Sequence, residues 1–196
     1  MISNLKQPFN DWFISNYLYK LGQRYNSLAL SCNLILDRTL FNIIETGTSR
    51  LINNEPGDGC ATLLFSEVAS LIGGRVWTCD ILEENIDICR YITAKNVDHI
   101  EYVIDDSVEF LNRFPHVIDF LYLDSMDFII GGDPNPSQNH VVNEYQAAKG
   151  KLSKDSLILI DDCALPNGGK GGKLCPILES DGWKCVFNGY QKLYSK

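Results

Sequence analysis

The feature of the sequence that most constrains its fold is a repeating alternation of short apolar runs and longer helical candidates. The apolar runs are rich in β-branched and aromatic residues and lie at 41–46, 75–81, 100–105, 118–124, 156–161 and 183–187. The helical candidates lie at 61–72, 83–95, 107–114, 138–149 and 174–180. Strand and helix alternating in this way is typical of βαβ units, which build a mostly parallel sheet.

The runs also indicate how the sheet is covered and how it ends. LILI at 157–160 is continuously apolar, as expected for a parallel strand that helices cover on both faces. The final YQKLYSK alternates after an Asn-Gly pair, which predicts an antiparallel partner for the run at 183–187. We therefore expect an α/β fold whose C-terminal strand is antiparallel.

The N-terminal part predicts a helical cap. Large apolar residues recur at steps of three or four, which places them on one face of a helix over 9–28. They are Phe9, Phe13, Tyr17, Leu21, Tyr25 and Leu28. This face packs on the core or, in the alternative interpretation, forms a lid over a substrate pocket. At 196 residues we expect a single domain, with a cap over 1–38 and a Rossmann-like core over 39–196.

Composition narrows the partners and the compartment. The net charge is −8 and the 17 Lys and Arg are scattered, which argues against nucleic acid. No signal peptide and no run of about 18 apolar residues is present, so we expect a cytoplasmic protein without a membrane partner. The seven cysteines form no CxxC pair, which favours a reducing compartment and argues against zinc.

Acidic residues close five successive apolar runs. They are Glu45, Asp80, Asp105, Asp106, Asp124, Asp161 and Asp162. Ligands of open α/β sheets bind outside the carboxyl ends of the strands, where all these acids are expected. Each one alone is compatible with a helix N-cap, most clearly Asp106 before SVEFL. A ring of acids on one rim, however, is repulsive unless a ligand or a cation compensates it.

Asp80 and the first glycine turn indicate the kind of ligand. Asp80 follows Gly47 by about thirty residues, the position from which a carboxylate accepts hydrogen bonds from both ribose hydroxyls. The turn ETGTSR at 45–50 lacks the GxGxxG of a dinucleotide site. The pattern favours a ligand with a ribose but without a pyrophosphate.

The ordered segments resemble the motifs of a known class. IIETGT, VWTCDI, VIDDS, IDFLYLDSMD and SLILIDDCA, which cover about residues 41–163, resemble those of class I S-adenosylmethionine-dependent methyltransferases. The chain looks most like the small metal-dependent catechol- and caffeoyl-type O-methyltransferases and their bacterial relatives. The resemblance implies a doubly wound, Rossmann-like sheet of seven strands and methyl transfer from S-adenosylmethionine. It implies cofactor contacts at Glu45, Gly47, Thr48, Asp80, Asp105, Asp106 and Asp124.

The same resemblance implies a divalent cation, Mg²⁺, Mn²⁺ or Ca²⁺, held by Asp124, Asp161 and Asp162. The ion would lower the pKa of a bound hydroxyl and orient it. The sequence departs from the catechol-type pattern at Asp127, where those enzymes have a Lys base, and at Asp162, where they have Asn. The alternative is that Asp124 contacts cofactor or substrate while the other two acids cap the following loop.

Two residues are predicted to be catalytic, Asp124 and His140. His140 and Glu144 form an i, i+4 pair in the predicted helix 138–149. An imidazole there is able to accept a proton from a hydroxyl near neutral pH. A surface histidine without a role is the alternative.

Two polar loops carry further hypotheses. GGKGGK at 168–173 is predicted to hold a phosphate or a carboxylate through Lys170, Lys173 and backbone N–H groups, with a flexible linker as the alternative. The segment 49–58 is an insertion in the first glycine motif. It is predicted to be a lid over the methionine end of the cofactor, where Arg50 or Asn53 contacts a carboxylate, or else a solvated bulge.

The sequence thus predicts an S-adenosylmethionine-dependent methyltransferase that methylates a hydroxyl of a small polar molecule. The expected partner is that small-molecule substrate, and a homodimer is a further expectation. A nicotinamide-dependent oxidoreductase and a non-catalytic binding module on the same fold are the alternatives.

Overall fold

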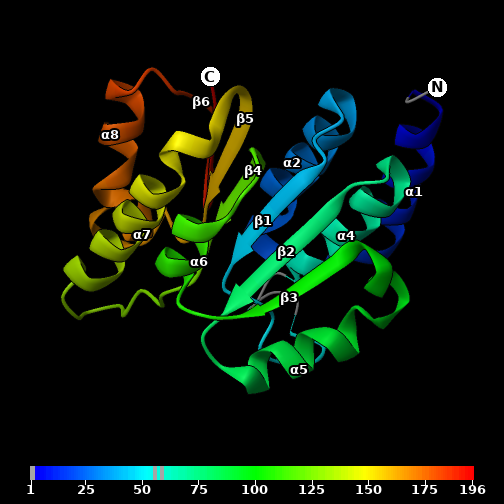
Figure 1. The fold of residues 1–196 in the computed structure, drawn as a ribbon, viewed down its shortest axis with the longest axis horizontal. Helices are drawn as coiled ribbons and strands as arrows, with labels where there is room; N and C mark the ends of the chain where they lie inside the picture. The colour runs from blue at the N-terminus through cyan, green and yellow to red at the C-terminus, as the bar shows by residue number, and fades with distance from the viewer. Residues whose placement is uncertain (1–2, 55–56, 58–59) are drawn as a thin grey trace.

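The computed structural model describes residues 3–54, 57 and 60–196 (Figure 1). Within these residues seven strands form one sheet in the order β3-β2-β1-β4-β5-β7-β6. The strands are β1 (Asn42–Thr46), β2 (Arg75–Asp80), β3 (Ile100–Ile104), β4 (Ile118–Leu123), β5 (Leu152–Ile160), β6 (Lys184–Asn188) and β7 (Lys192–Ser195). The first five are parallel, and β7 is antiparallel to both β5 and β6. The predicted fold class, including the C-terminal hairpin, is confirmed.

Helices cover both faces of the sheet. They are α1 (Ser3–Tyr17), α2 (Tyr25–Arg38), α4 (Ala61–Ile72), α5 (Glu83–Ile92), α6 (Ser107–Arg113), α7 (Asn135–Ala148) and α8 (Leu174–Ser180). Short 3-10 turns are η1 (Gly22–Arg24), η2 (Ala94–His99), η3 (Lys149–Lys151) and η4 (Pro166–Gly172). Helices α1, α2 and α4 lie on one face of the sheet and α6, α7 and α8 on the other (Figure 1). The apolar residues of each group form a separate core with the sheet. The sheet is therefore doubly wound.

Some element boundaries differ from the prediction, because the residues at the ends of these elements are polar or exposed. The strand expected at 156–161 begins at Leu152. The sequence pattern does not reveal its first four residues, because they are partly or fully exposed and mostly polar. The helix expected at 138–149 begins at Asn135. The helix expected at 83–95 ends at Ile92, and a 3-10 turn follows it.

The single N-terminal helix predicted over 9–28 is wrong. The structure has two helices, α1 and α2, separated by a turn in which Gly22 has a φ of +53°, outside the helical range. Five of the six residues of the predicted face are nevertheless buried in one core, and Tyr25 packs against the same core. The break also turns Arg24 inward, so that only 10% of its side chain is exposed.

The described residues contain no helix that is both long and apolar enough to cross a membrane. All seven cysteines are free thiols, and only Cys185 is exposed.

The packing of α4 on the sheet gives a stability prediction. Phe65 is fully buried, and its ring centroid lies 5.0 Å from that of Phe120 and 5.8 Å from that of Tyr122. We expect Phe65→Ala to lower the free energy of unfolding by about 3–5 kcal/mol, because it leaves a cavity among these rings. Urea unfolding measures the loss. Tyr91→Ala on α5, where the side chain is 71% exposed, is the control and should change it by less than about 0.5 kcal/mol. Equal losses in the two variants would contradict the buried position of Phe65.

Candidate functional site

Two adjoining cavities of about 260 Å³ each lie at the carboxyl ends of the parallel strands. The first cavity is lined by Gly47, Cys79, Asp80, Ile81, Asp105, Asp106, Ser107, Ser125, Met126 and His140. The second is lined by Arg24, Gly47, Thr48, Arg50, Gly57, Asp80, Asp124, Ser125, Asp127, Phe128, Ile130, Asp162, Leu165 and Tyr190. The strand order reverses between β1 and β4, and ligands of doubly wound sheets bind at such a switch point.

Gly47 lines both cavities, as do Asp80 and Ser125. It follows β1 with a φ of +81°, and its N–H donates to the Cys79 carbonyl at 2.8 Å. A Cβ at this position would lie 2.5 Å from the Asp124 carbonyl oxygen, so a larger residue would push the end of β4 away. Thr48 lines the second cavity, with its hydroxyl 3.3 Å from that of Thr62.

Asp80 lies at the end of β2 and lines both cavities. Its Oδ1 accepts hydrogen bonds from the Leu82 N–H at 2.9 Å and from the Asn85 side-chain amide at 3.1 Å. These bonds fix the carboxylate at the rim. The position is the one that the sequence predicts for a ribose contact.

Asp105 and Asp106 lie side by side in the first cavity. The Asp105 carboxylate pairs with Arg113 of α6. The Asp106 side chain accepts hydrogen bonds from the N–H groups of Val108 and Glu109, so it caps α6 as the sequence suggests. Because Asp106 also lines the cavity, the cap does not remove it from the predicted site.

His140 lines the first cavity and not the second. Its Nε2 lies 3.0 Å from the Ser107 hydroxyl and 3.6 Å from Oε1 of Glu144, a buried carboxylate that also accepts a bond from Ser125. The contact with Glu144 raises the pKa of His140, although burial opposes it. This geometry places His140 with the predicted cofactor residues, so its role as a catalytic base stays a prediction.

Glu45 lines neither cavity. Its carboxylate is buried, and Oε2 accepts hydrogen bonds from the hydroxyls of Thr62 on α4 and Thr78 on β2, the latter at 2.7 Å. Burial raises the pKa of Glu45 to about 7, although these bonds lower it. Glu45 therefore joins α4 to the sheet, and the cavity lining does not support the cofactor contact predicted for it.

The predicted insertion contributes Arg50 to the second cavity. The Arg50 guanidinium pairs with Asp127 at 2.8 Å, and both side chains are about half exposed or more. Asp127 is the residue found where the catechol-type pattern has a lysine. Residues 55, 56 and 58 of the insertion lie outside the described residues, so the lid stays a prediction.

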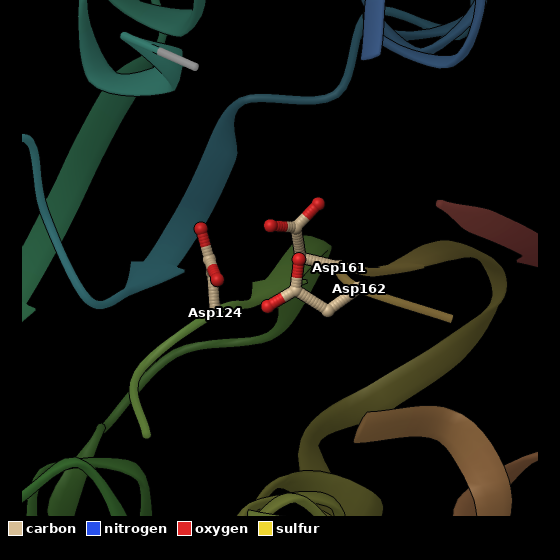
Figure 2. Close-up of side chains that lie close together, drawn as sticks. All are labelled: Asp124, Asp161 and Asp162. Carbon is tan, nitrogen blue, oxygen red and sulfur yellow. The ribbon is translucent and has the colours of Figure 1, made fainter. Parts of the chain in front are cut away.

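Three aspartates converge at the ends of β4 and β5 (Figure 2). Asp124, Asp161 and Asp162 each have a carboxylate oxygen within 4.8 Å of those of the other two. The structure thus brings together the three acids that the resemblance assigns to a cation.

Arg24 already compensates Asp161. The guanidinium Nε donates to both carboxylate oxygens at 3.0 and 3.1 Å, and Nη2 donates to Oδ2 at 2.6 Å. The side-chain amide of Gln191 donates to Oδ1 at 2.8 Å. Burial alone would raise the pKa of Asp161, but the Arg24 bonds and charge hold it below its ordinary value.

Lys170 compensates the other two acids. Its ammonium donates to Oδ1 of Asp124 and to the Asp124 carbonyl, the latter at 3.3 Å, and lies 3.4 Å from Oδ2 of Asp162. Only 1% of the Lys170 side chain is exposed. The glycine-rich loop is predicted to hold a phosphate or a carboxylate through Lys170 and Lys173. In the structure Lys170 contacts carboxylates of the chain itself, and Lys173 contacts the side chains of Asn135 and Asn139.

The remaining carboxylate oxygens have hydroxyl donors. Tyr122 donates to Oδ2 of Asp124 at 3.0 Å, and Tyr190 donates to Oδ1 of Asp162 at 2.5 Å. Each of the six carboxylate oxygens of the three aspartates therefore faces a donor or a cation of the protein. A divalent ion needs several of these oxygens as ligands, so the donor set as arranged does not fit one.

Asp124 and Asp161 differ in how readily they take up a proton. Burial and the nearby Asp161 raise the pKa of Asp124 well above its ordinary value, and Lys170 opposes the rise. Asp161, by contrast, is held ionised by Arg24. The surroundings of Asp124 therefore favour its protonated form more than those of Asp161 favour protonation there.

The strand order, the antiparallel final pair and the cavities at the switch point define the class I methyltransferase fold. Among solved structures, an O-methyltransferase from Bacillus cereus in complex with S-adenosylhomocysteine (SAH) has a TM-score of 0.60 and 16% identity over 97% of this chain and 90% of its own. The SAH-bound methyltransferase PaMTH1 from Podospora anserina has a TM-score of 0.58 and 15% identity over 97% and 86%.

A TDP-rhamnose 3′-O-methyltransferase of calicheamicin biosynthesis has a TM-score of 0.64 and 14% identity over 98% of this chain and 93% of its own. No family profile matches the sequence, and no curated protein matches it either. At these identities the likeness concerns the fold, and at that level the resemblance seen in the sequence is confirmed.

The functional residues that sequence reasoning misses are mainly the counterions. Arg24 is hidden inside an apolar helical pattern, and the glycine-rich loop pattern assigns Lys170 to an external anion. The one signal is the ring of acids itself, since buried acids require compensating charges from somewhere in the chain.

The buried carboxylate of Glu45 gives a pH prediction. Its pKa rises from an ordinary 4.5 to about 7, so its contribution to stability is complete below pH 4.5 and is lost as the pH rises through about 7. Glu45→Gln retains one oxygen that can accept both threonine bonds, and it does not titrate. Relative to this variant, the wild-type free energy of unfolding should fall by about 3 kcal/mol from pH 4 to pH 8. Urea unfolding at several pH values measures it, and parallel curves would contradict the assignment.

Proposed function

We propose that the protein is an S-adenosylmethionine-dependent methyltransferase that methylates a hydroxyl of a small polar molecule. The observation that carries the proposal is the Asp80 carboxylate at the rim shared by two cavities, beside Gly47, in a class I methyltransferase fold. When bound, S-adenosylmethionine supplies a methyl group on a positively charged sulfur. The SAH complexes of proteins with this fold support the choice of cofactor.

The first cavity is proposed to hold the adenosine. Among the described residues, both hydrogen bonds that Asp80 accepts end on Oδ1, which leaves Oδ2 for a ribose hydroxyl. Asp105, Ser107 and His140 also line this cavity and supply polar atoms for the purine. Gly47 lets the cofactor approach the backbone closely.

The second cavity is proposed to hold the acceptor. Asp124 lines it, and its raised pKa suits a general base. In the proposed step the Asp124 carboxylate takes the hydroxyl proton while the acceptor oxygen bonds to the methyl carbon. The methyl group would come from S-adenosylmethionine, which would leave as SAH with the electron pair on a neutral sulfur. Positioning of the two reactants supplies much of the acceleration.

The divalent cation stays a prediction from the resemblance. Because every carboxylate oxygen of Asp124, Asp161 and Asp162 already faces a donor or cation of the protein, no step of the proposed reaction uses a metal. The cytoplasmic location and the homodimer likewise stay predictions from the sequence.

Calorimetric titration with SAH tests the cofactor. We expect binding by the wild type and a loss of about 10- to 100-fold in affinity for Asp80→Ala, since charge-assisted bonds to the ribose are removed. Asp87→Ala on the exposed face of α5 is the matched control and should bind like the wild type. NADH should not bind, whereas the oxidoreductase alternative predicts that it does. Absence of any heat at millimolar SAH would refute the proposal.

Release of SAH from S-adenosylmethionine in the presence of a panel of hydroxyl acceptors tests the reaction. We expect Asp124→Asn to lower kcat by about 10²- to 10⁴-fold, the usual contribution of a general base. Asp87→Asn on the exposed face of α5, which lines neither cavity, should change kcat by less than about fivefold. Equal effects of the two substitutions would exclude Asp124 as the base. Binding of SAH without turnover on any acceptor would favour the non-catalytic alternative.

A further inference from the structure

The acidic cluster differs from a metal site in one respect: the chain supplies the positive charge. We propose that the Lys170 ammonium, together with the Arg24 guanidinium, takes the place of a divalent cation between Asp124, Asp161 and Asp162. The cluster itself is independent of the proposed function, but its role in methyl transfer rests on it.

The contacts of Lys170 resemble those of a bound ion. An ammonium has three N–H donors, and Lys170 faces three acceptors: Oδ1 of Asp124, the Asp124 carbonyl and Oδ2 of Asp162. The side chain is almost completely buried. Burial alone would lower the pKa of Lys170, but the three aspartates raise it, so the group stays charged.

The charge of the cluster is nearly balanced without a metal. Three carboxylates face two cations, and Arg24 reaches Asp162 as well as Asp161, at 3.4 Å. A divalent ion between the same oxygens would face the Lys170 ammonium at close range and be repelled by it. It would bind only by displacing Lys170.

The glycine-rich loop is built to keep Lys170 in place. Gly169 has a φ of +53°, and a Cβ there would lie 1.6 Å from the Asp162 carbonyl oxygen, so the backbone packs directly on the end of β5. The Gln138 side-chain amide, from α7, donates to the carbonyls of Asn167 and Gly169 at 3.1 and 2.9 Å. The contact with β5 explains why position 169, next to Lys170, is a glycine.

A fixed ammonium does different chemistry from a metal. Lys170 does not line the second cavity and directs its donors at the protein's own oxygens, so it does not bind the acceptor. It acts as a positioning residue that orients the Asp124 carboxylate through its contacts with Oδ1 and with the Asp124 carbonyl. The predicted consequence is a proton acceptor whose geometry is set by the fold.

Titration with Mn²⁺ followed by electron paramagnetic resonance tests the proposal without cofactor or acceptor. At about 1 mM Mn²⁺, above the dissociation constants of many weak sites, the wild type should leave the free-ion signal unchanged. Lys170→Ala should bind one Mn²⁺, because it frees oxygens of Asp124 and Asp162 and leaves room for the ion. Lys173→Ala, which removes an exposed lysine from the end of the same loop, is the control and should behave like the wild type.

Two results would overturn the proposal: one Mn²⁺ bound by the wild type and lost in Asp124→Asn, or a folded Lys170→Ala that binds none. If Lys170→Ala does not fold, the melting temperatures of Lys170→Met and of the double variant Lys170→Met/Asp124→Asn are compared instead. The double variant should have the higher melting temperature, because it lacks the carboxylate that Lys170→Met leaves unpaired. A lower melting temperature for the double variant would overturn the proposed ion cluster. None of these measurements needs methyl transfer, so their failure is distinguishable from failure of the proposed function.

Discussion

The rest of the site depends on the buried ion pair between Arg24 and Asp161. A carboxylate with no exposed surface is strongly unfavourable unless a cation and further donors compensate it. Arg24 provides two N–H groups, and Gln191 adds a third donor while accepting a 2.5 Å bond from Ser27 at the start of α2. The N-terminal cap is thereby joined to the end of β5 by polar contacts as well as by its apolar face. Removing the cap would leave the buried Asp161 without its guanidinium partner.

The two cavities have different chemical characters. Aspartates line both, but among the described residues the His140–Ser107 contact borders the first cavity, whereas the guanidinium groups of Arg24 and Arg50 border the second. They meet at Gly47, where the absent side chain lets β1 and β4 approach. This division suits a reaction between two ligands that enter separately and touch at one point. The proposed transfer is such a reaction, with the methyl group at the junction.

Much of the fold could be predicted because apolar runs mark buried parallel strands, and the acids that end those runs, such as Asp80, reach the rim together. The helix break within 9–28 could not be predicted, since the apolar periodicity continues through it. The environment of the Glu45 carboxylate could not be predicted either, because strand alternation does not reveal that two threonine hydroxyls donate to it. The cations that pair with the acids are distant in the sequence: Arg24 is 137 residues from Asp161, and Lys170 is 46 residues from Asp124. Local sequence patterns carry no information about such pairs.

The turn between α1 and α2 has a consequence for how the molecule assembles. Arg24 leaves the ribosome long before Asp161 and Gln191, which are separated from the cap by the whole parallel sheet. Closing so long a loop is entropically costly until the intervening strands have paired. The Arg24 guanidinium must therefore remain hydrated while β1 to β4 form, and it loses that water only when β5 arrives. Completion of the site is in this sense a late event of folding, and a chain that stopped before β5 would have a cap without its polar anchor.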